Sequence, residues 1–142
     1  MDIVDLLKQK KIRVIEIGNW GGYLRNEWEK QFANHLSQSD KKSIYLFDQD
    51  GACGYLWHLF SYGKRNCLTE ELANEAFNQA HKKSCFLFYQ HSDTAFIIEN
   101  ASGFTADDLH DESDVYIVDK HFNWTYVKTH ETGWCGPYFS RK

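Results

Sequence analysis

Two pairs of short apolar segments, each pair joined by a few polar residues, constrain the fold of this chain most. The first pair is CFLFYQ (85–90) and TAFIIEN (94–100), and the second is DVYIVD (114–119) and NWTYVKT (123–129). Aromatic and β-branched residues bounded by turn residues are typical of β-hairpins. Because CFLFYQ is continuously apolar, we expect it to be buried on both faces. Successive hairpins predict a mainly antiparallel sheet.

Two segments have helical periodicity instead. Large apolar residues recur every four positions over 21–37, after a candidate N-cap at Asn19, and predict a buried stripe of Trp20, Leu24, Trp28, Phe32 and Leu36. Thr69 begins the second helix, whose first turn carries two glutamates; its apolar face comprises Leu72, Ala73, Ala76, Phe77 and Ala80. We interpret these tryptophans as core residues.

Shorter segments complete the order of elements. We expect a short helix at 3–10, strands at 12–17 and 43–47, a short helix at 106–109 and a packed aromatic tail at 133–139. Residues 55–62 (YLWHLFSY) fit both a helix and a strand. A turn precedes them and Gly63 follows them, which favours a strand.

This order predicts an α+β fold, with two main helices packed on a mainly antiparallel sheet. The length of 142 residues is that of a single domain, residues 1–142.

Charge and cysteine usage exclude several classes of function. With 16 basic and 20 acidic residues the net charge is −4, so nucleic-acid binding is not expected. We expect neither a membrane span nor a signal peptide, because no apolar run is long enough for a span and the first residues lack the signal-peptide order. Its four cysteines form no C-x-x-C pair, which favours reduced thiols in the cytoplasm. We predict no metal and no cofactor, because zinc-ligand, phosphate-loop and dinucleotide spacings are all missing.

Three residues are candidates for catalysis: Cys53, His130 and Glu131. If residues 54–61 were a helix, Cys53 would lie at its N-terminus, where the helix dipole favours a thiolate. His130 would then act as the base, oriented by an acidic residue. The alternatives are a thiol in a turn, and a His130–Glu131 pair that only binds backbone at the end of a hairpin.

Aromatic residues outside the predicted core are candidates for binding a partner. Trp57, with the adjacent His58, and the C-terminal aromatics could form one exposed patch, and a large exposed patch indicates an interaction site. The full set of binding candidates is Trp57, His58, Trp124, Tyr126 and Tyr138.

Four strings resemble a known family: YLWHLFSYGK (55–64), IVDK (117–120), WTYVKTHE (124–131) and GPYF (136–139). Their order is similar to that of a family of small bacterial proteins known only as a domain of unknown function. The resemblance spans nearly the whole chain and implies a cytosolic protein. It implies no catalytic residues. Relatives in this family occur near genes for secreted toxins, which implies that the chain is an immunity-type protein and the partner of a toxin.

We therefore expect a non-catalytic module that binds another protein. An immunity-type protein that neutralises a toxin is one module of this kind. An enzyme is the less favoured hypothesis. The alternatives are a small thiol- or His/Glu-dependent hydrolase, and a small-molecule sensor with an aromatic pocket. The oligomeric state stays open.

Overall fold

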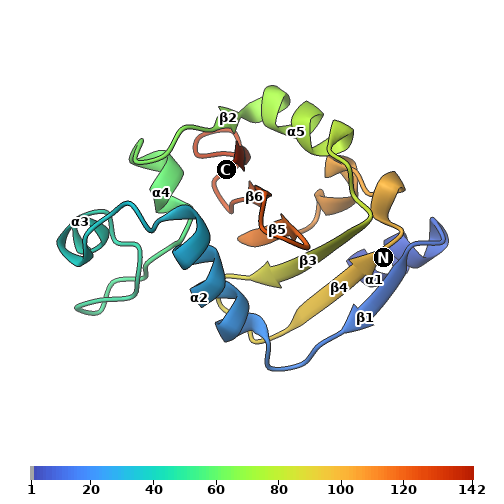
Figure 1. Ribbon diagram of the computed structural model, residues 1–142, viewed down its shortest axis with the longest axis horizontal. Helices are drawn as coiled ribbons and strands as arrows, with labels where there is room; N and C mark the ends of the chain where they lie inside the picture. The colour runs from blue at the N-terminus through green and yellow to red at the C-terminus, as the bar shows by residue number, and fades with distance from the viewer. Residues whose placement is uncertain (1) are drawn as a thin grey trace.

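A computed structural model describes residues 2–142 (Figure 1). Within this range the strands form one seven-stranded antiparallel sheet with the order β1-β4-β3-β5-β6-β7-β2. The strands are β1 (Arg13–Glu16), β2 (Leu68–Thr69), β3 (Ser84–Tyr89), β4 (Ala95–Glu99), β5 (Val115–Asp119), β6 (Trp124–Lys128) and β7 (Tyr138–Arg141). The helical segments are α1 (Ile3–Gln9), α2 (Gly21–Phe32), α3 (Gln38–Ser43), α4 (His58–Ser61), α5 (Glu70–Gln79), and the 3₁₀ turns η1 (Ala101–Gly103) and η2 (Ala106–Leu109). The predicted α+β class is confirmed.

Both predicted hairpins are present, and they form the centre of the sheet. In the first, β3 pairs with β4 so that Cys85 lies opposite Ile98. In the second, β5 pairs with β6 so that Val115 lies opposite Lys128. Strand β3 also pairs with β5, and this joins the two hairpins.

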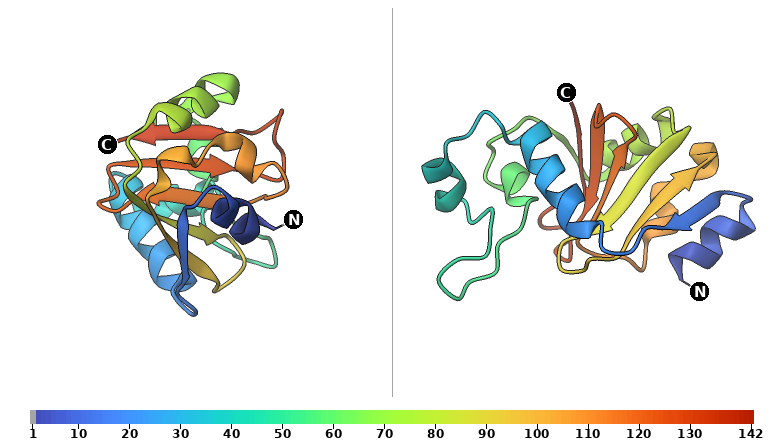
Figure 2. Two further views of the ribbon diagram at one scale, coloured as in Figure 1. Left: turned by 90° about the vertical axis from the view of Figure 1, so that its right-hand side faces the viewer. Right: turned by 60° about the horizontal axis from the view of Figure 1, so that its bottom comes forward.

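Helices cover both faces of the sheet, as the views in Figure 2 show. On one face α1 and α5 enclose a core that includes Phe77, Leu87 and Ile117. On the other face α2 and α4 enclose a second core that includes Trp28 and Tyr116. Successive residues of β5 alternate between the two cores, so four of its five residues are buried. A strand covered on both faces reads as a continuous apolar run.

Two predicted strands are wrong. Residues 43–47 form the end of α3 and a turn, and residues 55–62 form a turn followed by α4. Both segments nevertheless supply buried apolar side chains, among them Ile44, Leu46, Leu59 and Phe60. Burial thus accounts for both apolar runs, and a short apolar run does not distinguish a strand from an irregular segment packed on a sheet.

The first long helix is shorter than predicted. It ends at Phe32, and a new helix, α3, follows, with Ser37 as its N-cap in a capping box with Asp40. Its N-cap is Trp20, whereas Asn19 lies in the left-handed region with φ 67°. Trp20 is 44% exposed and does not belong to the buried stripe.

The second long helix and the tail agree with prediction except at two side chains. Thr69 is the N-cap of α5, but Leu72 is exposed. In the tail, Tyr138 and Phe139 are buried in β7, whereas Trp134 is 90% exposed.

Candidate functional site

The candidate site lies at one end of the sheet, where several strands begin or end. Asp114 immediately precedes β5, and His130 follows β6 by two residues. The antiparallel register of these strands brings the start of one next to the end of the other. His91 comes from the turn between β3 and β4, which meets the same end of the sheet.

His130 is oriented by Asp114. Its Nδ1 lies 3.0 Å from both carboxylate oxygens of Asp114, and its backbone N–H donates to Asp114 Oδ1 at 3.2 Å. The indole Nε1 of Trp57 donates to the same Oδ1 at 3.0 Å. A carboxylate at Nδ1 selects the tautomer that leaves Nε2 as a free acceptor. Since the His130 side chain is 40% exposed, this acceptor is accessible.

Tyr55 lies at the centre of a group of rings. Its ring centroid is 5.0 Å from that of Trp57, 5.4 Å from His58, 5.3 Å from His91 and 5.2 Å from His130. Burial raises the pKa of Tyr55, and the nearby carboxylate of Asp114 raises this pKa further. We call Tyr55, Trp57, His58, His91, Asp114 and His130 the histidine cluster.

The structure brings together three of the sequence-predicted residues, Trp57, His58 and His130. Sequence reasoning missed Tyr55, His91 and Asp114, and of these Asp114 is the hydrogen-bond partner of His130. The predicted partner, Glu131, is farther away, with its Oε1 3.7 Å from His130 Nε2. The predicted hairpin contained the signal, because its register places residue 114 beside the residues that follow β6.

Four of the five predicted binding residues are core residues. Trp57 is only 2% exposed, although its indole N–H reaches Asp114. Trp124, Tyr126 and Tyr138 are at most 5% exposed. The first two pack with Phe77 of α5, whereas Tyr138 packs with Phe60 on the opposite face of the sheet. They therefore form no common surface patch, and this interpretation of the C-terminal aromatics is corrected.

Cys53 lies in an exposed loop and not at a helix N-terminus, because α4 begins only at His58. Among residues 2–142 no thiol or hydroxyl group hydrogen-bonds the ring of His130. Burial raises the pKa of the Cys135 thiol, and so does its hydrogen bond to Glu131. The described chain thus holds an oriented imidazole without an adjacent activated nucleophile.

Exposed aromatic side chains extend the histidine cluster across the surface. The ring of Tyr62 lies 5.4 Å from that of His58, and the Tyr45 carbonyl lies 2.9 Å from His58 Nδ1. Trp134 occupies the turn after His130, where its N–H donates to the carbonyl of Glu131 at 2.9 Å. Tyr45 and Tyr62 are 44% and 49% exposed.

Two further features concern metal binding and membrane spanning. Within residues 2–142 no group of three or more His, Cys, Asp or Glu side chains is arranged to hold a metal ion. Over the same range, no helix has the length and apolar character needed to span a membrane.

An antiparallel sheet covered on both faces, with an Asp–His pair at one end, defines an α+β protein with a polar aromatic site. Residues 1–139 match the model of a family described as a domain of unknown function, DUF4275, and the chain belongs to that family. No curated protein and no solved structure is significantly similar to it. The resemblance to an uncharacterised family is thereby confirmed.

Proposed function

We propose that this chain is a non-catalytic module that binds another protein, and that it does so through the surface around the histidine cluster. This surface, which we call the aromatic face, consists of Tyr45, Tyr55, His58, Tyr62, His91, His130 and Trp134.

The observation that carries the proposal is the exposure of Trp134. Its side chain is 90% exposed on a turn that also carries His130 and Glu131. Tryptophan and tyrosine are enriched at the energetic centres of protein interfaces, because they bury a large area at little cost in conformational entropy. An exposed tryptophan on the turn that carries His130 is therefore typical of a contact surface.

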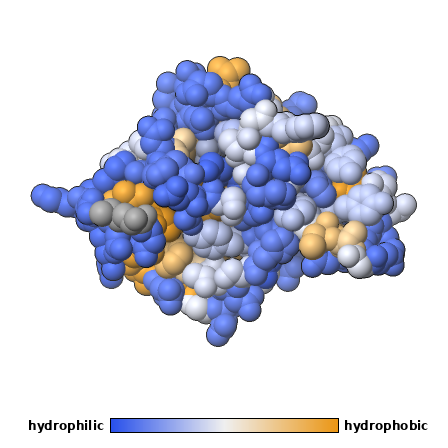
Figure 3. Space-filling model, turned by 180° about the vertical axis from the view of Figure 1, so that it is seen from behind, coloured by the Kyte–Doolittle hydropathy of each residue, from blue (hydrophilic) through white to orange (hydrophobic). Residues whose placement is uncertain are grey.

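The side chains of the aromatic face are amphipathic. Figure 3 shows one face of the molecule, mostly hydrophilic, with hydrophobic areas that are small and separate. Tyrosine, tryptophan and histidine each join a flat ring to a polar atom. A surface made of them suits a partner that exposes polar groups as well as apolar ones.

The charges beside the aromatic face favour a basic partner. Asp48, Asp114 and Glu131 all lie near enough to Tyr55 to raise its pKa. Among residues 2–142, Asp48 has no partner in an ion pair. The whole chain carries a net charge of −4. Complementary charge accelerates association and selects the partner.

A secreted toxin with a basic active surface is one partner of this kind, so the proposal includes an immunity-type role in a bacterium. The proposed compartment is the cytoplasm. The four free thiols are consistent with it, because reduced cysteines are the norm in reducing compartments.

One observation favours a second function, that of a hydrolase with His130 as general base. The contact between Asp114 and His130 Nδ1 is the arrangement that prepares an imidazole to accept a proton at Nε2. Such an enzyme would have to activate water directly, since no thiol or hydroxyl of residues 2–142 hydrogen-bonds the ring.

Site-specific photo-crosslinking in the producing cells tests the binding proposal. A benzophenone amino acid replaces Trp134 or Tyr62 on the aromatic face, and Leu72 serves as the control. Leu72 is 61% exposed on α5, the helix that covers the opposite face of the sheet. We expect one shared protein crosslinked at positions 134 and 62 and absent at 72.

The captured protein is then purified and its affinity measured by calorimetry. W134A and Y62A should each weaken binding about tenfold or more, L72A should leave it unchanged, and added salt should weaken it. Equal capture at all three positions, or an affinity insensitive to W134A, would overturn the proposal. Turnover abolished by H130A in the absence of any partner would favour the hydrolase.

A further inference from the structure

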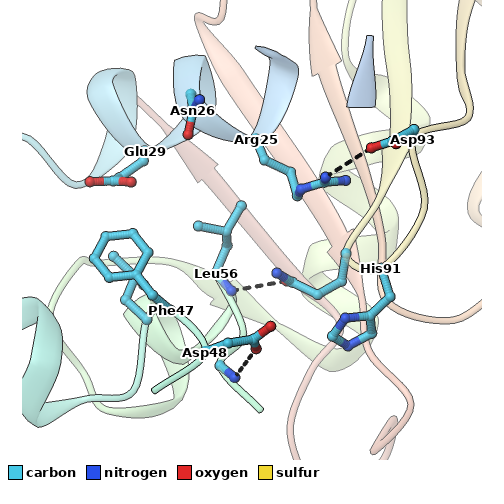
Figure 4. A pocket seen from close by; sticks show the side chains of 11 residues that line it. Arg25, Asn26, Glu29, Phe47, Asp48, Leu56, His91 and Asp93 are labelled. Atoms are coloured by element: carbon cyan, nitrogen blue, oxygen red, sulfur yellow. Dashed lines mark hydrogen bonds and ion pairs between the residues drawn. The ribbon is translucent and has the colours of Figure 1, made fainter. Parts of the chain in front are cut away.

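A cleft beside the histidine cluster has no role in the proposed protein contact. It lies between α2, the segment 46–56 and the turn between β3 and β4, and its volume is about 420 Å³ (Figure 4). This volume is within the range of small-molecule sites. The residues that give it chemical character are Arg25, Asp48, Leu56, Gln90 and His91, and we call it the α2 cleft.

The positive charge in the α2 cleft is held in place by backbone. Arg25 Nη1 donates to the carbonyls of Tyr89 at 2.9 Å and Ser92 at 2.6 Å. Among residues 2–142 its one carboxylate partner is Asp93, which lies 3.4 Å from Nη2 and is 71% exposed. Neutral carbonyls position the guanidinium without cancelling its charge. The Nε–H and one N–H of Nη2 remain to bind an anionic group. The planar guanidinium matches the geometry of a carboxylate.

The amide of Gln90 adds an oriented donor. The backbone N–H of Trp57 donates to the hydroxyl of Tyr116, and this hydroxyl in turn donates to Gln90 Oε1. Leu56 N–H donates to the same Oε1 at 3.0 Å. Because two donors occupy the oxygen, the other end of the amide must be the NH₂ group. Within residues 2–142 this NH₂ has no acceptor, and it is not sealed from solvent.

The opposite wall of the cleft carries negative charge. Asp48 Oδ1 accepts a hydrogen bond of 2.7 Å from Gly54 N–H, which fixes the carboxylate and leaves Oδ2 open. Glu29 also lines the cleft, but Lys41 at 2.8 Å neutralises it. In Figure 4 Arg25 lies on the α2 side and Asp48 on the side of segment 46–56, with Leu56 between them in this view and Phe47 to the left.

A cationic donor and an amide on one wall, an unpaired carboxylate on the other and an apolar lining together fit a small zwitterion. We propose that the α2 cleft binds a free α-amino acid with an apolar side chain. The ligand carboxylate meets Arg25 and the Gln90 NH₂ group, the ammonium meets Asp48, and the side chain contacts Phe47 and Leu56. This inference does not rest on the protein contact, although His91 belongs to the aromatic face and Asp48 also contributes charge beside it.

NMR titration of the full chain with L-alanine, L-leucine and L-phenylalanine tests this site. At least one should give saturable shifts at the NH₂ group of Gln90 and the Arg25 Nε–H, with half-saturation below about 10 mM. N-acetyl-leucine lacks the ammonium and leucinamide lacks the carboxylate. Each should bind about tenfold more weakly than leucine, because one of the two charge contacts is lost.

D48N is the decisive variant, because the asparagine oxygen can still accept from Gly54 while the charge is removed. It should weaken binding about tenfold, whereas D50N, in the same loop but outside the cleft, should not. Thermal melts of both variants verify folding. The proposal is wrong if none of the three amino acids saturates the cleft, or if D48N binds as tightly as D50N. Neither result affects the crosslinking expected at Trp134, which tests the proposed protein contact separately.

Discussion

The indole nitrogen of Trp28 on α2 donates a hydrogen bond of 2.9 Å to the hydroxyl of Thr125 in β6, and both residues are fully buried. The Thr125 hydroxyl donates in turn to the carbonyl of Ile117 in β5 at 3.1 Å. This chain of donors ties the first long helix to the centre of the sheet, and it satisfies a polar atom that water cannot reach.

Replacement of Thr125 by valine should therefore destabilise the fold. The valine keeps the shape but leaves the indole N–H without an acceptor, which costs about 1–3 kcal/mol. Urea unfolding measures the loss. In a W28F background the same T125V change should cost less, because no indole remains to be satisfied. Equal costs of T125V in both backgrounds would contradict the assigned bond.

The ion pair between Lys41 and Glu29 should also stabilise the fold measurably. Its atoms are 2.8 Å apart, and the side chains are only 8% and 18% exposed. K41M leaves Glu29 with a charge that is mostly shielded from water, so we expect a loss of about 2 kcal/mol in unfolding free energy. The matched control K42M removes an exposed neighbouring lysine and should change stability by less than about 0.5 kcal/mol.

Gly54 should tolerate no side chain. A Cβ atom there would lie 2.0 Å from the backbone carbonyl carbon of Phe47, so G54A must separate the two ends of the Asp48 loop. We expect a fall in unfolding free energy of about 1–3 kcal/mol and loss of the α2 cleft. G18A is the control, since nothing lies within 4 Å of a Cβ atom at that position. A melting temperature for G54A equal to that for G18A would refute this packing.

Stability should fall in alkaline solution, partly because of Cys85. Burial raises the pKa of this thiol from 9.0 to about 12. Between these two values the unfolded chain loses the proton while the folded chain keeps it. The unfolding free energy therefore falls as the pH rises, by at most about 1.4 kcal/mol per pH unit from this group. C85A removes that contribution, so its stability between pH 9 and 10.5 should decline less steeply than that of the parent.

The tautomer of His130 should depend on Asp114 and not on Glu131. With Nδ1–H facing the Asp114 carboxylate, ¹⁵N chemical shifts of the parent ring should show an unprotonated Nε2 at alkaline pH. D114A should shift the ring toward the mixture of tautomers found in free imidazole, and it should also move the Trp57 indole N–H signal. E131A should leave both signals in place; a larger effect of E131A than of D114A would reverse the assignment.

The sequence by itself determined the parts of this protein whose structure follows from local pattern. The two hairpins, the helix after Thr69 and the start of the helix near residue 21 all follow from periodicity and turn residues, and together they define the α+β class. It also predicted His130 as a candidate site residue at a strand end, because binding and catalytic residues occur disproportionately on loops.

Only the tertiary structure decided which aromatics are exposed and which residue orients His130. Residues 43–47 and 55–62 pack on the sheet as turns and short helices, since side-chain burial against α2 and β5 outweighs their strand propensity. Trp124, Tyr126 and Tyr138 are buried because helices cover both faces of the sheet, a fact that no single strand pattern encodes. Asp114 reaches His130 through strand register, which is a relation between distant segments and not a property of either one.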